Sequence, residues 1–216
     1  MKFKAVVFDL DGTLLDTLVD IGNGVNRVLE TNGFPRHPLE SYRYFMGDGP
    51  RQLIIRALPP EAQRPEVIEI CLKGYLAAYN RQLNQNTELF PQIGPLLDQL
   101  TEKGLKLAVL TNKRHELAQA CMGQFFGAWS FWPVLGFRDD VPPKPNPAAA
   151  LEIAQKLALA PEACLFVGDS DVDMATAKAA GMLGAGAVWG YRSSDELRRA
   201  GAALLLENPL DLLDAL

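Results

Sequence analysis

The chain has little cysteine, little histidine and no excess of positive charge. Its 216 residues include three cysteines and two histidines, and 21 basic against 26 acidic residues leave a net charge of -5. Cys71, Cys121 and Cys164 are far apart and lie in apolar stretches, so we expect free structural thiols, not disulfides or a zinc site. Contacts with nucleic-acid phosphates normally require a basic face, and the net charge is negative, so we expect no nucleic-acid partner.

Long apolar segments are also missing. Residues 1–4 lead into a short apolar run that soon meets Asp9 and Asp11, so we expect neither a signal peptide nor a transmembrane span. The expectation is a cytoplasmic protein, monomer or homodimer, without a membrane partner. His37 and His115 lack the spacing of a metal site or a catalytic triad, and we interpret both as surface residues.

What the chain does contain is an alternation of short apolar runs and helical patterns, with 48% hydrophobic and 22% charged residues. This pattern predicts an α/β fold, a doubly wound, Rossmann-like parallel sheet. The expected strands are 5–8, 105–110, 164–167, 185–189 and 203–206; the expected helices are 91–103, 115–126, 147–157, 173–180 and one that closes the chain. Ligands of such sheets bind at the carboxyl ends of the strands, where Asp9, Thr111 and Asp169 lie.

The segment from residue 17 to residue 87 interrupts the alternation. Its apolar residues recur at helical spacings and it contains no convincing strand, which predicts an inserted helical domain. Polar residues at 16–17 and 84–87 suit two hinge strands that link this insert to the core. We therefore expect a core of residues 1–16 and 88–216 and a helical cap of residues 17–87.

Two carboxylates, Asp9 and Asp11, follow the first expected strand directly, with Gly12 after them. A carboxylate such as Asp9 can attack phosphorus and form an aspartyl-phosphate, which divides one difficult hydrolysis into two easier steps. Asp11 can then protonate the leaving oxygen and later deprotonate water. The alternative is a pair of solvated loop carboxylates with Thr13 as a helix cap.

The sequence resembles the haloacid dehalogenase superfamily of phosphatases along almost its whole length. Four motifs of that superfamily occur here in order, at 6–17, 110–113, 144–147 and 168–173. The resemblance implies that Asp9 and Asp169 bind Mg²⁺ directly and that the backbone oxygen of Asp11 is a further ligand. It also implies that Asp173 helps through water or by orienting the other ligands.

The residue types in the later motifs suit phosphate chemistry on physical grounds as well. The Thr111 hydroxyl and the Asn112 amide, at a strand end where a helix begins, could bind a phosphoryl oxygen. Lys144, in a stiff proline-rich loop, could direct its ammonium group at the phosphate. The alternatives are a plain helix cap for Thr111 and a surface lysine for Lys144.

Asp169 and Asp173 offer hard oxygen ligands of the kind that magnesium prefers. The alternative is that both acids merely favour the start of a helix through its dipole. Four carboxylates and a phosphate in one crevice repel one another, so a divalent ion is expected, and one carboxyl pKa should be raised. We expect that group to be Asp11, because it has to donate a proton.

A helical insert after the first motif resembles the cap of this superfamily, which closes over the site and selects the leaving group. The loop at 45–51 and the residues at 189–191 look most like those of phosphoglycolate phosphatases, which implies a small phosphorylated metabolite, 2-phosphoglycolate, as substrate. Arg51 is a candidate to pair with a substrate carboxylate; alternatively it faces solvent. Residues 89–93 depart from these relatives, which usually have a turn that ends in glycine where Gln92 stands.

Other activities remain open at this point. A phosphosugar mutase of the same superfamily would use the same core motifs, so only the cap can distinguish it from a hydrolase. A dehalogenase would not need Asp11 or a pair of metal-binding acids. A catalytically silent binding module is the alternative of another class, because a fold does not imply a function.

Overall fold

The computed structural model describes residues 2–81 and 84–216. The chain divides into two compact units. One consists of Met1–Asp16 and Leu89–Leu216, and the other of Thr17–Glu88. In the described part of the chain, no helix has both the length and the apolar character needed to cross a membrane.

The first unit is built on a six-stranded sheet in which every neighbouring pair of strands is parallel. In spatial order the strands are β5 (Phe131–Phe137), β4 (Lys106–Arg114), β1 (Ala5–Phe8), β6 (Cys164–Gly168), β7 (Leu183–Ala187) and β8 (Leu204–Leu206). All four residues of β1 are buried, as the continuous apolar run indicates. The predicted doubly wound α/β fold is confirmed.

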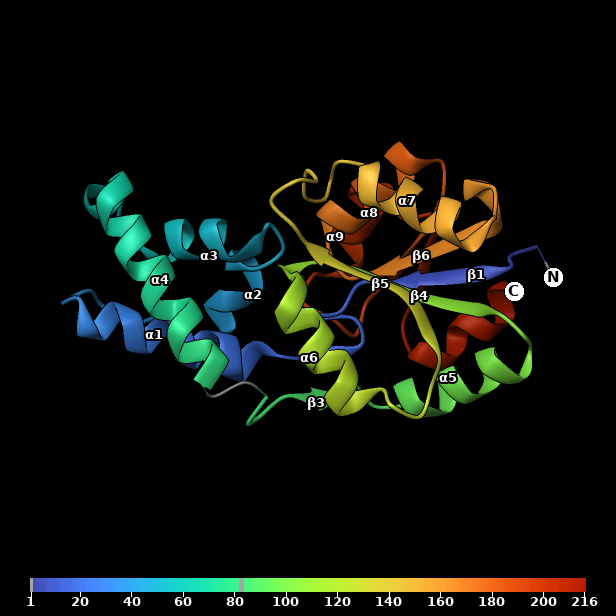
Figure 1. Ribbon diagram of the computed structural model, residues 1–216, viewed down its shortest axis with the longest axis horizontal. Coiled ribbons are helices and arrows are strands. Elements are labelled where there is room, and N and C mark those ends of the chain that lie inside the picture. The colour runs from blue at the N-terminus through green and yellow to red at the C-terminus, as the bar shows by residue number, and fades with distance from the viewer. Residues whose placement is uncertain (1, 82–83) are drawn as a thin grey trace. The chain divides into compact units, whose positions relative to one another are not determined.

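Helices cover both faces of this sheet (Figure 1). On one face lie α5 (Ile93–Glu102) and α6 (His115–Phe125), and on the other lie α7 (Ala148–Leu157), α8 (Asp171–Ala180) and α9 (Ser194–Arg199). Val7, Leu110 and Phe166 of the sheet are buried in the same core cluster as Ile153 of α7 and Ala177 of α8. This packing holds the ends of β1, β4 and β6 together, and these ends carry the candidate site.

The sequence did not predict β5 or α9. Strand β5 contains Pro133 and Gly136, which disfavour a strand, but it lies at the sheet edge, where proline is tolerated. Helix α9 has only six residues and begins with a capping box between Ser193 and Glu196. The expected closing helix is the 3-10 helix Pro209–Ala215.

The second unit is helical, as its spacing of apolar residues predicts. It contains α1 (Leu18–Thr31), α2 (Tyr42–Phe45), α3 (Gly49–Ala57) and α4 (Pro65–Arg81), with 3-10 turns at Leu39–Ser41 and Pro60–Ala62. The buried Asp20 carboxylate accepts hydrogen bonds from Asn86 and Thr87, so the start of α1 is tied to the returning chain. The expected hinge strands form, slightly displaced, as β2 (Leu15–Asp16) and β3 (Glu88–Leu89), which pair with each other.

Candidate active site

A tight turn follows β1 and fixes the first pair of acids. The amides of Leu14 and Leu15 both donate hydrogen bonds to the carbonyl oxygen of Leu10 at 3.0 Å, which folds the chain back. Gly12 has a φ of +87°, and a Cβ there would lie 2.4 Å from Oδ2 of Asp169. Glycine is therefore required at this position, and the turn holds residues 9 and 11 at the end of the strand.

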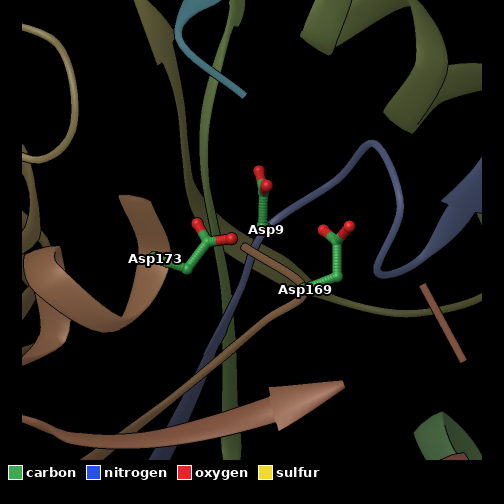
Figure 2. A group of neighbouring side chains, drawn as sticks. All are labelled: Asp9, Asp169 and Asp173. Carbon is green, nitrogen blue, oxygen red and sulfur yellow. The ribbon is translucent and has the colours of Figure 1, made fainter. Parts of the chain in front are cut away.

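Three carboxylates from separate motifs come together beside this turn. Oxygens of Asp9, Asp169 and Asp173 all lie within 4.8 Å of one another, and all three residues are buried. Figure 2 shows the three side chains around the ends of β1 and β6 and the start of α8. The donor set is suited to a hard divalent cation.

Lys144 is the cation that the chain itself provides at this cluster. Its side chain is 2% exposed, and its Nζ atom lies 3.0 Å from Oδ1 of Asp9 and 2.6 Å from Oδ1 of Asp173. Burial alone lowers the pKa of Lys144, but the two carboxylates raise it above its usual value, so the group stays charged. Lys144 is therefore not a surface lysine, and in the structure its ammonium group is held by protein carboxylates.

Asp173 is fully engaged by protein groups. Its Oδ1 atom accepts a hydrogen bond from Nζ of Lys144. Its Oδ2 atom accepts hydrogen bonds from the amide of Ser170 at 3.0 Å and from the hydroxyl of the same residue at 2.6 Å. These contacts form the capping box that starts α8 at Asp171, two residues before the expected start. In this arrangement Asp173 contacts Lys144 and caps α8.

Asp169 is oriented by two residues whose part the sequence did not indicate. The hydroxyl of Thr13 donates to its Oδ1 at 3.1 Å, and the amide of Tyr191 donates to its Oδ2 at 2.9 Å. Thr13 thus supports an acid instead of capping a helix. A Cβ on Gly190 would lie 2.3 Å from Cβ of Asp169, so this residue has to be glycine for Tyr191 to approach.

The carboxyl pKa values of Asp9 and Asp169 are raised, and the sequence did not single out either group for such a shift. Burial raises the pKa of Asp9 to about 7; Lys144 opposes this increase and Asp173 adds to it. Burial and the negative charges of Asp173 and Asp9 raise the pKa of Asp169 to about 8. Both shifts follow from several acids buried in one place with a single lysine between them.

Asp11 has a different partner. Both oxygens of its carboxylate accept hydrogen bonds from the ammonium group of Lys113, whose Nζ atom lies 2.7 Å from Oδ1 and 3.0 Å from Oδ2. The sequence contained a signal for this contact, because Lys113 follows Thr111 by two residues and alternate strand residues share a face. Asp11 therefore has a cation of its own, distinct from Lys144.

The second motif lies differently from the prediction. Strand β4 continues to Arg114, and α6 begins at His115, so Thr111 is not at a helix start and its role as a helix cap is wrong. The Thr111 hydroxyl accepts a hydrogen bond from the amide of Lys113 at 3.2 Å. The Asn112 side chain binds the backbone of Lys144 through its amide nitrogen at 3.0 Å and its oxygen at 2.9 Å, which ties the third motif to the second.

Comparison with known proteins agrees with this geometry. The family model described as haloacid dehalogenase-like hydrolase matches residues 6–187. The chain belongs to the haloacid dehalogenase-like hydrolase family. The resemblance stated from the four motifs is thus confirmed.

Relatives and solved structures of this hydrolase family cover nearly the whole chain. A Pseudomonas aeruginosa protein named phosphoglycolate phosphatase 1 is 33% identical over 97% of this chain and 78% of its own. A Psychrobacter arcticus phosphoglycolate phosphatase is 31% identical over 100% of this chain and 96% of its own. A crystal structure from Lactobacillus delbrueckii subsp. bulgaricus has a TM-score of 0.91 at 29% identity and covers 100% of this chain and 98% of that one.

Arg51, His37 and His115 each contact a residue of their own unit. Arg51 is 52% exposed and forms an ion pair with Glu69 of α4, within the helical unit. His37 and His115 are half-buried and not surface residues: a ring nitrogen of each makes a hydrogen bond, to the oxygen of Ala57 and the amide of Gly136 respectively. The three cysteines are buried, and none forms a disulfide within the described residues, as expected.

Proposed function

We propose that this member of the family is a magnesium-dependent phosphatase that hydrolyses a small phosphate monoester through an aspartyl-phosphate on Asp9. One observation carries the proposal. Asp9 directly follows β1 and lies beside a buried lysine and two further buried acids, while Asp11, two residues later, is held by Lys113. This arrangement supports two carboxylates with different tasks at one place.

The buried acids fit a divalent cation. When all are ionised, Asp9, Asp169 and Asp173 bring three negative charges, and Lys144 offsets one of them. Asp9, Asp169 and the backbone oxygen of Asp11 would hold Mg²⁺, with Asp173 behind them. A bound magnesium ion would offset the remaining two negative charges and would help to stabilise the transferring phosphoryl group.

In the first half of the proposed reaction, a carboxylate oxygen of Asp9 forms a bond to phosphorus and the bond from phosphorus to the ester oxygen breaks. The carboxylic acid form of Asp11 gives its proton to that leaving oxygen, which departs as an alcohol. In this proposal, Lys144 and the Thr111 hydroxyl donate hydrogen bonds to oxygens of the transferring group.

In the second half, water attacks the phosphorus of the aspartyl-phosphate and gives a proton to the Asp11 carboxylate. The bond between phosphorus and the Asp9 oxygen breaks, which releases inorganic phosphate and restores the Asp9 carboxylate. Asp11 is again the acid that the first half needs. The two aspartates thus complete the cycle without any other proton carrier.

For the substrate, we propose 2-phosphoglycolate. The support is the name of the Pseudomonas and Psychrobacter relatives, which align along almost all of this chain. Arg51 remains our candidate for the substrate carboxylate, and it would have to exchange Glu69 for that carboxylate. We place the enzyme in the cytoplasm, as a monomer or homodimer.

The test is release of inorganic phosphate from a panel of phosphorylated acids, sugars and nucleotides, with and without magnesium. We expect metal-dependent hydrolysis with preference for 2-phosphoglycolate, and loss of turnover in Asp9→Asn. Asp171→Asn is the matched control, since Asp171 is an exposed acid of the fourth motif. Activity that survives in Asp9→Asn would contradict the proposal, as would transfer of phosphate within a hexose phosphate without release.

A further inference from the structure

We propose that Lys113 is a positioning residue for Asp11: it holds the acid/base carboxylate in place through contacts with both of its oxygens. The inference rests on the proposed function, because it gives Lys113 a role in the same reaction. The Nζ atom lies 2.7 Å from Oδ1 and 3.0 Å from Oδ2 of Asp11, and the Lys113 side chain is only 5% exposed.

The two ends of this contact are themselves fixed. Lys113 lies on β4, which pairs with β1 in parallel, and its amide donates a hydrogen bond to the Thr111 hydroxyl. Asp11 lies in the turn after β1, where the amide of Gly12 donates to the oxygen of Leu15 at 2.9 Å. A carboxylate held at both oxygens from a rigid strand cannot rotate freely about its side-chain bonds.

The burial of Lys113 indicates that the contact has a purpose beyond surface charge pairing. An ammonium group is costly to bury unless it is paired, whereas exposed ion pairs contribute little. The Asp11 side chain is itself only 19% exposed. The chain therefore keeps two buried lysines at one site, Lys144 for Asp9 and Asp173, and Lys113 for Asp11.

A role in positioning has a kinetic signature. Proton transfer from Asp11 matters most when the leaving oxygen is strongly basic, as in an alkyl phosphate, and least for a p-nitrophenolate leaving group. A misplacement of about 1 Å can lower a rate about 100-fold. We therefore expect Lys113→Met to lower kcat about 100-fold with 2-phosphoglycolate, and less than about threefold with p-nitrophenyl phosphate.

The experiment compares wild type, Lys113→Met, Asp11→Asn and the double variant with both substrates in the presence of magnesium. If Lys113 acts through Asp11, its replacement should change kcat less than about twofold once Asp11 is asparagine. Lys106→Met is the control, because Lys106 lies at the other end of β4 and donates to the oxygen of Leu157. Should Lys113→Met fail to fold by thermal unfolding, Lys113→Gln takes its place in the same comparisons.

The outcomes separate this inference from the proposed function. The role of Lys113 would be overturned if Lys113→Met lowered kcat equally with both substrates, or if the effects of the two substitutions were additive in the double variant. In that case wild type would still be active and Asp9→Asn would still be inactive. Failure of the proposed function would instead appear as wild type without phosphatase activity or as an active Asp9→Asn. An unequal loss that disappears in the Asp11→Asn background supports the inference.

Discussion

Replacing Lys144 by methionine tests the electrostatics of the site without any substrate. Met has about the length of lysine, so Lys144→Met removes the charge and keeps most of the packing. The change takes away the ammonium group that contacts Asp9 at 3.0 Å and Asp173 at 2.6 Å. The three buried carboxylates then lose the cation that contacts two of them.

The size of the effect follows from the protonation of these acids. Removing one partner of a buried ion pair costs about 3–5 kcal/mol, because the other charge is left unpaired. At pH 7 the loss should be near the lower end of this range, since Asp9 already has a pKa of about 7 and can bind a proton instead. At pH 8.5 proton binding is less favourable, so the loss should be larger.

Urea unfolding of the metal-free proteins measures this difference. Trp129, Trp132 and Trp189 are the three tryptophans of the chain and all lie in the sheet-containing unit, so their fluorescence follows that unit. A loss of about 3 kcal/mol corresponds to a shift of about 1 M or more in the urea midpoint. The exposed Lys178→Met on α8 is the control and should stay within about 0.5 kcal/mol of wild type. Equal midpoints for Lys144→Met and wild type at both pH values would refute the reasoning.

Four further predictions concern the metal, the backbone and the pH. Gly190→Ala should displace the Asp169 side chain and weaken magnesium binding in calorimetry, because the new Cβ would lie 2.3 Å from Cβ of Asp169; unchanged affinity would contradict this. Gln92→Gly should raise stability by about 0.5–1 kcal/mol in thermal unfolding, because Gln92 has a φ of +68°, which glycine adopts without strain; a lower melting temperature would count against it. The two raised carboxyl pKa values lie near 7 and 8, so the folded metal-free protein binds more protons than the unfolded chain in this range. Its free energy of unfolding should therefore decrease as the pH is raised from about 4 to about 8. Magnesium affinity should rise between about pH 6 and pH 9, because these protons must leave; calorimetry that shows no such trend would refute the assignment.

Local patterns were sufficient to predict most of the fold. The apolar run of β1 followed by Asp9, and the alternation of runs and helical spacings after it, specify a parallel sheet with ligands at its carboxyl edge. Strand β5 was missed because Pro133 and Gly136 argue against a strand unless its place at the sheet edge is known. That place depends on contacts that the local sequence does not contain.

The candidate site was predicted in its residues and less well in its electrostatics. Spacing after strands brings Asp9, Asp169 and Asp173 to one edge, but the raised pKa values of Asp9 and Asp169 depend on the burial of these acids and on the charges beside them. Lys144 contacts Asp9, and Lys113 contacts Asp11, and a linear sequence does not distinguish these pairings. Tyr191 contacts Asp169 through its backbone amide, so the identity of its side chain does not indicate this contact in the sequence.

Detection of phosphate on Asp9 tests the central claim most directly. Wild type mixed with substrate and magnesium would be quenched in acid within a turnover and its peptides analysed by mass spectrometry. We expect transient phosphate on the peptide that contains Asp9, at that residue, and none in Asp9→Asn. Phosphate on another residue, or turnover in Asp9→Asn without any phosphorylated peptide, would contradict the account.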